Sequence, residues 1–176
     1  ATSLPEGRIA GTLQVAYLCP TEILAKQHFS TFVSYFSAKG GSASGGKDLI
    51  PINIGLITGS ECRKFPSRVR YEESAKLSKP AFKKMVTNGE IPIVIGTHAL
   101  IEKSLTFKYF AYAIIDEQHR FGTAHRQKFA TKGDIVPHLL SMTATPIPRT
   151  LALTIYGDLD LTLLDEMPAG RKSVMT

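Results

Sequence analysis

The chain has 176 residues, of which 43% are hydrophobic and 20% charged, and its formal net charge is +6. This is the composition of a globular domain with its own core, and it excludes collagen-like, coiled-coil and fully disordered chains. No run of 18 consecutive apolar residues and no secretory signal is found, so neither a membrane span nor export is predicted. Two cysteines, Cys19 and Cys62, are too few for a disulfide framework or a four-cysteine zinc site, which favours a reducing compartment.

Short apolar runs alternate with helix-like stretches along the chain. Strands are predicted at 13–19, 52–57, 91–95, 112–116 and 137–142. Helices are predicted at 21–36, at 79–88 (ended by Asn88-Gly89) and at 149–156 (ended by Gly157). Strands that are apolar throughout and separated by helices indicate an α/β fold with a parallel sheet covered on both faces.

Residues 37–51 interrupt this pattern with a Gly/Ser-rich stretch that has no periodicity. Such a composition predicts a flexible connector or insertion. Gly41–Lys47 has the spacing of a phosphate-binding loop, but Asp48 follows where Mg²⁺ needs a Ser or Thr hydroxyl. We therefore favour an insertion, and a small nucleotide kinase or ATPase that uses this loop is the alternative.

Polar residues collect where the predicted strands end. They are Pro20, Thr21 and Glu22; Thr58, Gly59 and Ser60; Gly96, Thr97 and His98; Asp116, Glu117, Gln118 and His119; and Thr143, Ala144 and Thr145. Open α/β sheets bind ligands beyond the carboxyl ends of their strands. We therefore expect one polar rim, with the acidic pair Asp116-Glu117 beside the hydroxyl-rich turn that starts at Thr143.

The acidic pair suggests nucleotide hydrolysis. One carboxylate can hold a hydrated Mg²⁺, which prefers oxygen ligands, while its neighbour orients and deprotonates a water for attack on a γ-phosphate. An acidic pair at an exposed strand end, with no catalytic role, is the simpler alternative.

Several segments resemble motifs of superfamily 2 DExH helicases, in the order of that family. They are CPTEILAKQH (19–28), LITGS (56–60), IVIGTHALI (93–101), DEQHRFG (116–122) and SMTATPIPRTLAL (141–153). Together with TATPIPRTLALTIYGDLD and DEMPAGRK, the DEQHRFG segment resembles RecG-type branched-DNA helicases in particular. The transcription-repair coupling factor has a similar segment after the last strand but typically carries DEEH, and it remains an alternative. The resemblance covers roughly residues 13–172, without 37–51 and parts of 61–80.

The resemblance implies a RecA-like ATP-binding domain that uses ATP and Mg²⁺. Asp116 would hold Mg²⁺ through water, Glu117 would activate the attacking water, and Gln118 and His119 would link the nucleotide to the last motif. Coupling of the nucleotide state to DNA would fall to Thr143, Ala144, Thr145 and Arg149. The tracked DNA strand would be contacted by Pro20, Thr21, Glu22, Thr58, Gly59, Thr97 and His98. Ordinary roles stay open: a helix cap for His98, a buried carbonyl partner for His119, a solvated loop residue for Gln118 and turn residues for Thr143 and Thr145.

No G-x-x-x-x-G-K-[ST] loop precedes residue 19. The expectation is therefore part of a first motor domain without its phosphate-loop strand, with residues 157–176 leading toward a second motor domain. Such a chain should hydrolyse ATP negligibly by itself and should present a gap or an exposed strand edge. The expected partners are branched, single- or double-stranded DNA, the second motor domain and a wedge domain, with no membrane, in a bacterial cytoplasm or a plant organelle.

Positive charge is concentrated in residues 61–84, which hold eight basic and three acidic side chains, a net +5. We name this segment the basic block. A charge cluster of this kind suggests a polyanion partner, and a solvated helix face is the alternative. A non-catalytic nucleic-acid-binding module is therefore a second candidate function.

Overall fold

A computed structural model describes residues 13–39, 52–67, 73–117, 121, 129, 136–144, 160, 162 and 164. The chain divides into two compact units, Ala1–Ala144 and Thr145–Thr176. Every helix and strand that the structure describes belongs to the first unit. Among these described residues, no helix has the length and apolar character needed to cross a bilayer.

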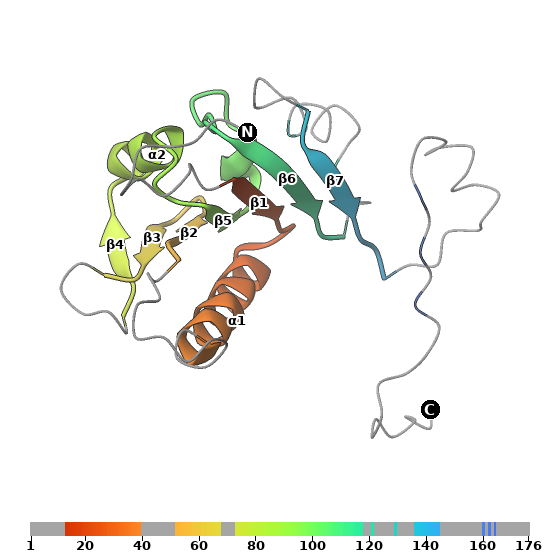
Figure 1. Cartoon of the computed structure of the whole chain (residues 1–176), viewed down its shortest axis with the longest axis horizontal. Coiled ribbons are helices and arrows are strands. Elements are labelled where there is room, and N and C mark those ends of the chain that lie inside the picture. The colour runs from red at the N-terminus through yellow and green to blue at the C-terminus, as the bar shows by residue number, and fades with distance from the viewer. Residues whose placement is uncertain are drawn as a thin grey trace, which may run out of the picture. The chain divides into compact units, whose positions relative to one another are not determined.

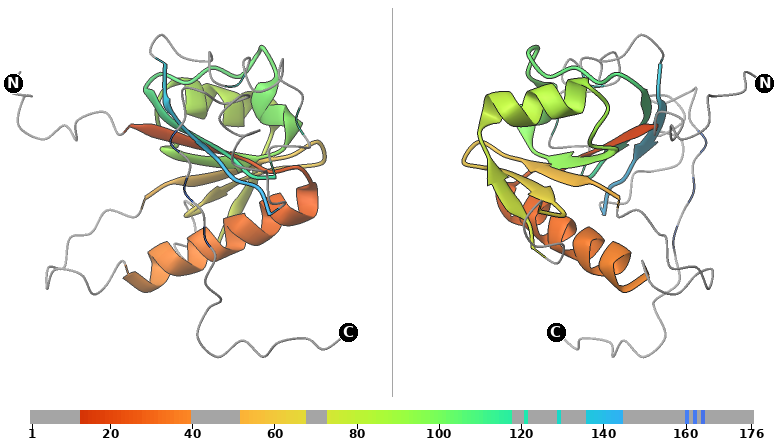
Figure 2. Two further views of the ribbon diagram at one scale, coloured as in Figure 1. Left: turned by 90° about the vertical axis from the view of Figure 1, so that its right-hand side faces the viewer. Right: turned by 60° about the vertical axis from the view of Figure 1, so that its left-hand side comes forward.

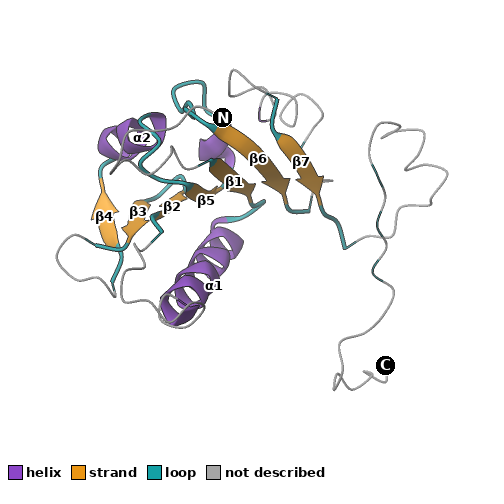
Figure 3. Ribbon diagram, viewed as in Figure 1, coloured by secondary structure: helices purple, strands orange, loops and turns teal. Residues whose placement is uncertain are grey.

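The first unit is built around one sheet with helices on both sides (Figures 1 and 3). Its strands are β1 (Gln14–Leu18), β2 (Ile54–Ile57), β3 (Cys62–Phe65), β4 (Ala75–Leu77), β5 (Ile93–Gly96), β6 (Phe110–Ile115) and β7 (His138–Ser141). Its helices are α1 (Glu22–Lys39), α2 (Lys79–Thr87) and the short 3₁₀ helix η1 (His98–Ile101).

The strand order is β4-β3-β2-β5-β1-β6-β7. The five strands from β2 to β7 in this order run parallel to one another, whereas β3 and β4 are antiparallel additions beside β2. All five predicted strands are confirmed. The prediction missed β3 and β4 because they are short and carry lysine and arginine, so neither forms an apolar run. The sheet is therefore mixed and mostly parallel.

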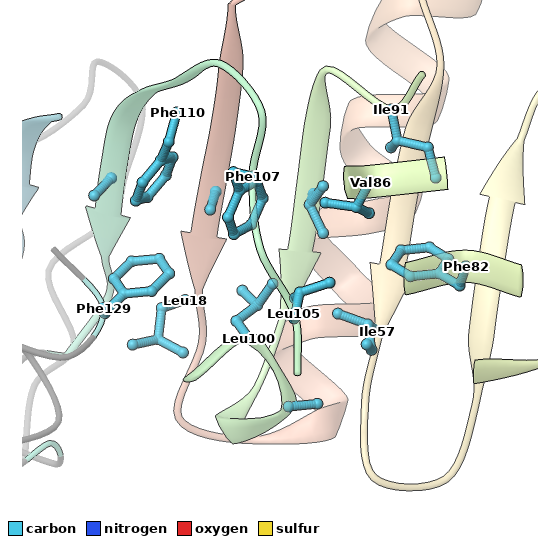
Figure 4. Packing of buried hydrophobic residues seen from close by; sticks show 14 of the residues in the cluster. Leu18, Ile57, Phe82, Val86, Ile91, Leu100, Leu105, Phe107, Phe110 and Phe129 are labelled. Carbon is cyan, nitrogen blue, oxygen red and sulfur yellow. The ribbon is translucent and has the colours of Figure 1, made fainter. Parts of the chain in front are cut away.

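Side chains alternate between the two faces of the sheet, and each face has its own core. On one face, Tyr17, Leu56 and Ile95 pack with Phe29 of α1. On the other face, the strand residues pack with α2 and η1 (Figures 2 and 4). The labelled members of this second core are Leu18, Ile57, Phe82, Val86, Ile91, Leu100, Leu105, Phe107, Phe110 and Phe129. Each fully buried side chain of this size contributes about 1.5–3 kcal/mol. The predicted covering of both faces is confirmed.

The helix ends follow local chemistry. The N–H of Leu24 donates to Thr21 Oγ1 at 3.3 Å, so Thr21 caps α1. The helix α2 ends at Asn88-Gly89 as predicted, and Gly89 has the left-handed φ of 79° that favours glycine after a helix. The helix α1 continues to Lys39, so the first three residues of the predicted connector are helical. Residues 40–51, the predicted helix at 149–156 and residues 165–176 lie outside the described residues.

Strand β7 forms one edge of the described sheet and pairs there with β6. Its residues alternate between exposed and half-buried, and Leu140 is 40% exposed. All four residues of β2 are buried, by contrast. β7 is thus an edge strand of the described sheet, and the gap or exposed edge expected from a missing phosphate-loop strand stays a prediction.

Candidate nucleotide and nucleic-acid site

Main-chain hydrogen bonds hold the loop starts at the carboxyl ends of the parallel strands. The first N–H beyond a strand donates to the last carbonyl of the neighbouring strand. The pairs are Thr97 to Ile57 (3.2 Å), Cys19 to Gly96 (2.8 Å), Asp116 to Leu18 (2.9 Å) and Met142 to Ile115 (2.9 Å). We call this edge of the sheet the rim. It places the loops that follow β2, β5, β1, β6 and β7 in one row.

The acidic pair and the hydroxyl-rich turn are neighbours on the rim. Ile115 and Ser141 are partners in the β6–β7 ladder, so Asp116 and Thr143 follow adjacent strands. The Asp116 side chain is 20% exposed, so the carboxylate is not sealed in the core. This confirms the central spatial expectation from the sequence.

The Asp116 carboxylate is held from the α1 side of the sheet. Asp116 Oδ2 lies 3.3 Å from His28 Nε2, and the Tyr17 hydroxyl lies 3.5 Å from the same nitrogen. The Tyr17 and His28 rings are 4.7 Å apart between centroids. Because a carboxylate can only accept, Nε2 carries the proton and donates to Asp116.

The charge of Asp116 affects two buried neighbours. Burial first, and Asp116 second, raise the pKa of Cys19 to about 12. The same two causes, in the same order, raise the pKa of Tyr17 well above its ordinary value. Both Cys19 and Cys62 are free and buried, so Cys19 is a small core residue.

Glu117 has an unusual backbone. Its φ is 48°, in the left-handed region that non-glycine residues seldom adopt. Such a conformation costs on the order of 1–2 kcal/mol and persists only where the surrounding structure imposes it. The second carboxylate of the acidic pair therefore sits on a strained turn directly after Asp116.

A pocket of about 430 Å³ opens on the rim beside the ends of β1, β2 and β5. We call it the rim pocket. It is lined by Pro20, Glu22, Gly59, Thr97, His98, Ala99 and Glu102. Five residues predicted to contact DNA thus come from three loops into one hollow. The His98 ring lies 5.4 Å from the Phe121 ring, at the start of η1.

Glu22 fixes the loop after β2. Its carboxylate accepts from the Ser60 N–H at 3.1 Å and from the Ser60 hydroxyl at 2.7 Å. The Ser60 hydroxyl is the largest of the causes that lower the pKa of Glu22. Thr58 is completely buried, and its hydroxyl accepts from the Glu61 N–H at 3.1 Å. Glu22 and Thr58 therefore shape the loop that presents Gly59 to the pocket.

The other acid of the rim pocket, Glu102, is paired with lysines of the basic block. Lys83 Nζ lies 2.7 Å from Glu102 Oε2, and Lys79 Nζ lies 3.6 Å from Oε1. The hydrogen bond from Lys83 is the largest cause that lowers the pKa of Glu102. Both carboxylates at the rim pocket thus have partners within the protein, which weakens their repulsion of a phosphate.

The basic block is partly neutralised by its own surroundings. Lys83 and Lys79 pair with Glu102, and Arg63 Nε lies 3.3 Å from Glu61 Oε2. These contacts favour the alternative of a solvated, ion-paired surface over a dedicated polyanion site. Arg68 and Arg70 lie outside the described residues.

Four predicted site residues lie outside the described residues: Gln118, His119, Thr145 and Arg149. Ala144 is described and exposed. The sequence reasoning missed His28 and the function of Ser60. His28 lies within the helix predicted at 21–36, and nothing in that prediction shows a contact with a residue 88 positions away.

Comparison with known proteins agrees with this geometry. The family description DEAD/DEAH box helicase matches residues 7–154, and the chain belongs to this family. The curated relatives include two proteins named ATP-dependent DNA helicase RecG. The chain is 42% identical to the one from Synechocystis sp. over 168 residues, and 45% identical to the one from Aquifex aeolicus over 164 residues. These alignments cover 96% and 93% of this chain but only 17% and 18% of the relatives, so the chain spans less than a fifth of their length.

Solved structures give the same picture. A structure of RecG bound to a three-way DNA junction matches 92% of this chain and 18% of its own, with 38% identity and a TM-score of 0.59. A Mycobacterium smegmatis helicase Lhr, bound to single-stranded DNA and AMP-PNP, matches 86% of this chain and 19% of its own with 17% identity and a TM-score of 0.53. The second match supports the fold alone. The RecA-like fold expected from the sequence is confirmed.

Proposed function

We propose that this chain is part of the first motor domain of a RecG-type, ATP-dependent DNA helicase that remodels branched DNA such as stalled forks and Holliday junctions. The observation that carries the proposal is the rim. It places the acidic pair next to the turn after β7, and it continues through the loop starts to the rim pocket. The RecG relatives and the RecG–junction structure supply the type of helicase and the class of DNA.

Asp116 is suited to hold Mg²⁺ of bound ATP through water. Its carboxylate is partly exposed at the end of β6, and one of its oxygens is oriented by His28. In the described part of the chain, no three His, Cys, Asp or Glu side chains cluster as metal ligands. One carboxylate is enough for Mg²⁺, which keeps several waters and binds the substrate phosphates as well. When bound, the ion neutralises the charge that develops on the phosphates.

Glu117 supplies the base in this proposal. Its position directly after Asp116 brings a second carboxylate to the same turn, where it can orient a water and take its proton. Removing a general base typically lowers a rate by about 10²–10⁴-fold. The turn at Thr143 and Ala144, on the adjacent strand, is placed to respond to changes at the acidic pair. Gln118, His119, Thr145 and Arg149 are proposed to take the remaining linking roles.

The rim pocket is the proposed contact with the DNA backbone. Hydroxyl groups such as that of Thr97 suit phosphate contacts, which position a strand without reading its sequence. The backbone N–H groups of Thr97 and Gly59 already have acceptors in Ile57 and Glu22, so Gly59 and His98 are proposed to border the strand as part of the pocket wall. Pro20 borders the same hollow, and Thr21, the next residue, caps the start of α1. Glu22 and Thr58 act by holding the loop in shape.

The experiment uses the natural protein in its full length. ATP hydrolysis is measured with and without branched DNA for the unaltered protein, for Glu117→Gln and for the control Glu90→Gln at an exposed site. We expect Glu117→Gln to abolish DNA-stimulated hydrolysis and Glu90→Gln to retain it. Equal rates for the unaltered protein and Glu117→Gln would contradict the proposal.

A second arm tests the chain by itself. Residues 1–176 are expected to hydrolyse ATP negligibly, because charge-stabilised phosphoryl transfer also needs a lysine and an amide cradle for the phosphates. Turnover in this chain that Glu117→Gln abolishes would refute this expectation. Localisation in the bacterial cytoplasm is part of the same proposal.

A further inference from the structure

We propose that His28 is a positioning residue for the Mg²⁺ carboxylate, and that α1 thereby connects the DNA side of the rim to the nucleotide side. The inference rests on the proposed function and adds a residue that the sequence reasoning did not assign to the site. It begins from one contact: His28 Nε2 lies 3.3 Å from Asp116 Oδ2, between residues 88 positions apart.

The contact sets the direction of the carboxylate. With Nε2–H donating to Oδ2, the other carboxylate oxygen, Oδ1, remains for a water of the bound ion. Carboxylates that serve metal ions are commonly fixed by such hydrogen bonds, and loss of the fixing partner typically costs about 10–100-fold in metal affinity or activity. His28 is half-buried, with 31% of its side chain exposed, so the hydrogen bond is partly shielded from water.

Aromatic packing also holds the His28 ring in place. It lies 4.7 Å from the Tyr17 ring, and the Phe32 ring meets Tyr17 edge-on at 6.1 Å. The Tyr17 hydroxyl, at 3.5 Å, is a weaker second acceptor for the same N–H. These contacts restrict the imidazole to the orientation in which it reaches Asp116.

The same helix is fixed at its start to the loop of the rim pocket. Glu22 begins α1 and holds Ser60, and His28 lies six residues further along, which is roughly 9 Å of helix. A shift of the β2–β3 loop caused by DNA is therefore passed along a rigid helix to Asp116. The helix offers a direct route between the two ligands of the motor.

The test measures binding as well as turnover in the full-length natural protein. The first readout is the free Mg²⁺ concentration needed for half-maximal binding of a non-hydrolysable, fluorescent ATP analogue. We expect His28→Leu to raise this concentration about tenfold or more, and His28→Gln to restore most of the binding, because its amide can donate from a similar place. Gln27→Leu, at the exposed neighbouring position, is the matched control and should change nothing.

The second readout is the ratio of DNA-stimulated to basal ATP hydrolysis. We expect it to fall in His28→Leu and to recover in His28→Gln, a pattern that a merely structural role would not give. An unchanged Mg²⁺ requirement in His28→Leu, or equal loss in both variants, overturns the inference and leaves the proposed function intact. Failure of the unaltered protein to bind the nucleotide at all would overturn both.

Discussion

Glu22 begins helix α1 and Ser60 lies in the loop after β2, and the Glu22 carboxylate joins them through two hydrogen bonds of 3.1 and 2.7 Å. The pair connects the start of α1 to the turn after β2. It also accounts for an acidic residue in a row of groups expected to meet a polyanion, because the charge of Glu22 is directed at the protein's own N–H and O–H groups.

The first prediction concerns this pair. Glu22→Ala should speed hydrogen exchange at the Ser60 amide, since the N–H loses its acceptor, and Glu22→Gln should speed it less because the amide oxygen still accepts. Exchange at Ser60 is measured by NMR in this chain. Glu90→Ala is the control, and a Ser60 amide that exchanges equally in all variants would contradict the contact.

Gln14 gives a prediction about stability. It is completely buried, and its amide donates to the Val86 and Ile91 carbonyls and accepts from the Lys108 and Tyr109 N–H groups. Each buried group left without its partner costs about 1–3 kcal/mol. Gln14→Leu should therefore lower the free energy of unfolding by about 3 kcal/mol or more, measured by urea denaturation.

The control for this prediction is Gln27→Leu, which makes the same change at an exposed position of α1. Its effect should stay within about 0.5 kcal/mol, as for most surface substitutions. A loss for Gln14→Leu no larger than that of Gln27→Leu would show that the four hydrogen bonds contribute nothing.

The left-handed backbone at Glu117 predicts that a glycine variant is at least as stable as an alanine variant at this position, which reverses their usual order of stability. In the middle of a helix or strand, glycine lowers the free energy of unfolding by roughly 0.5–1 kcal/mol relative to alanine. At φ 48° an alanine keeps the strain of about 1–2 kcal/mol that a glycine avoids. Glu117→Gly should therefore unfold at a temperature equal to or higher than that of Glu117→Ala, measured by calorimetry, although neither should support hydrolysis. A clearly lower temperature for the glycine variant would exclude the left-handed backbone.

Glu102 predicts a dependence on pH. Its pKa is lower in the folded chain than the ordinary value of 4.5, mainly because Lys83 donates to it. The unfolded state therefore binds more protons in the window between these two pKa values, and stability rises with pH across it. The contribution of the ionised Glu102 to the free energy of unfolding is complete above about pH 4.5, and it is lost as the pH falls through the pKa of Glu102 in the folded chain.

The measurement is the free energy of unfolding of the unaltered chain and of Glu102→Gln at several pH values. Since the Glu102 side chain is 40% exposed, the difference at neutral pH should be less than about 1 kcal/mol. It should shrink as the solution is acidified below pH 4.5. A difference that grows on acidification would have the wrong sign for this pairing.

The ion pairs of the basic block predict a weak role for Lys83 in DNA binding. Removal of a lysine that contacts a phosphate reduces the salt slope of binding by about 1. Lys83 is already bonded to Glu102 and to Ser104 Oγ at 2.6 Å, so Lys83→Gln should change the slope by much less. Lys84→Gln, at the exposed neighbouring residue, is the comparison. A reduction of the salt slope by about 1 in Lys83→Gln would indicate instead that the basic block contacts DNA.

The sequence predicted the parallel strands well because each is a continuous apolar run, and it predicted the rim because polar residues follow every one of them. It missed β3 and β4, because Arg63 and Lys64 interrupt the apolar residues of β3 and because β4 is only three residues long with a lysine at its centre. Contacts such as Asp116 with His28 depend on how a helix lies across the sheet. A pattern of residue types along the chain contains no information about such a crossing.

The row of main-chain hydrogen bonds at the rim has a practical consequence for mutagenesis. Backbone amides and carbonyls are common to nearly all amino acids, so the spacing of Thr97, Cys19, Asp116 and Met142 does not depend on which side chains these positions carry. The partly exposed Asp116 side chain can be exchanged while this frame stays in place, whereas Cys19 and Thr97 are buried and their side chains also contribute to packing. Loss of activity on exchange of Asp116 therefore reports on the chemistry of the carboxylate rather than on the scaffold.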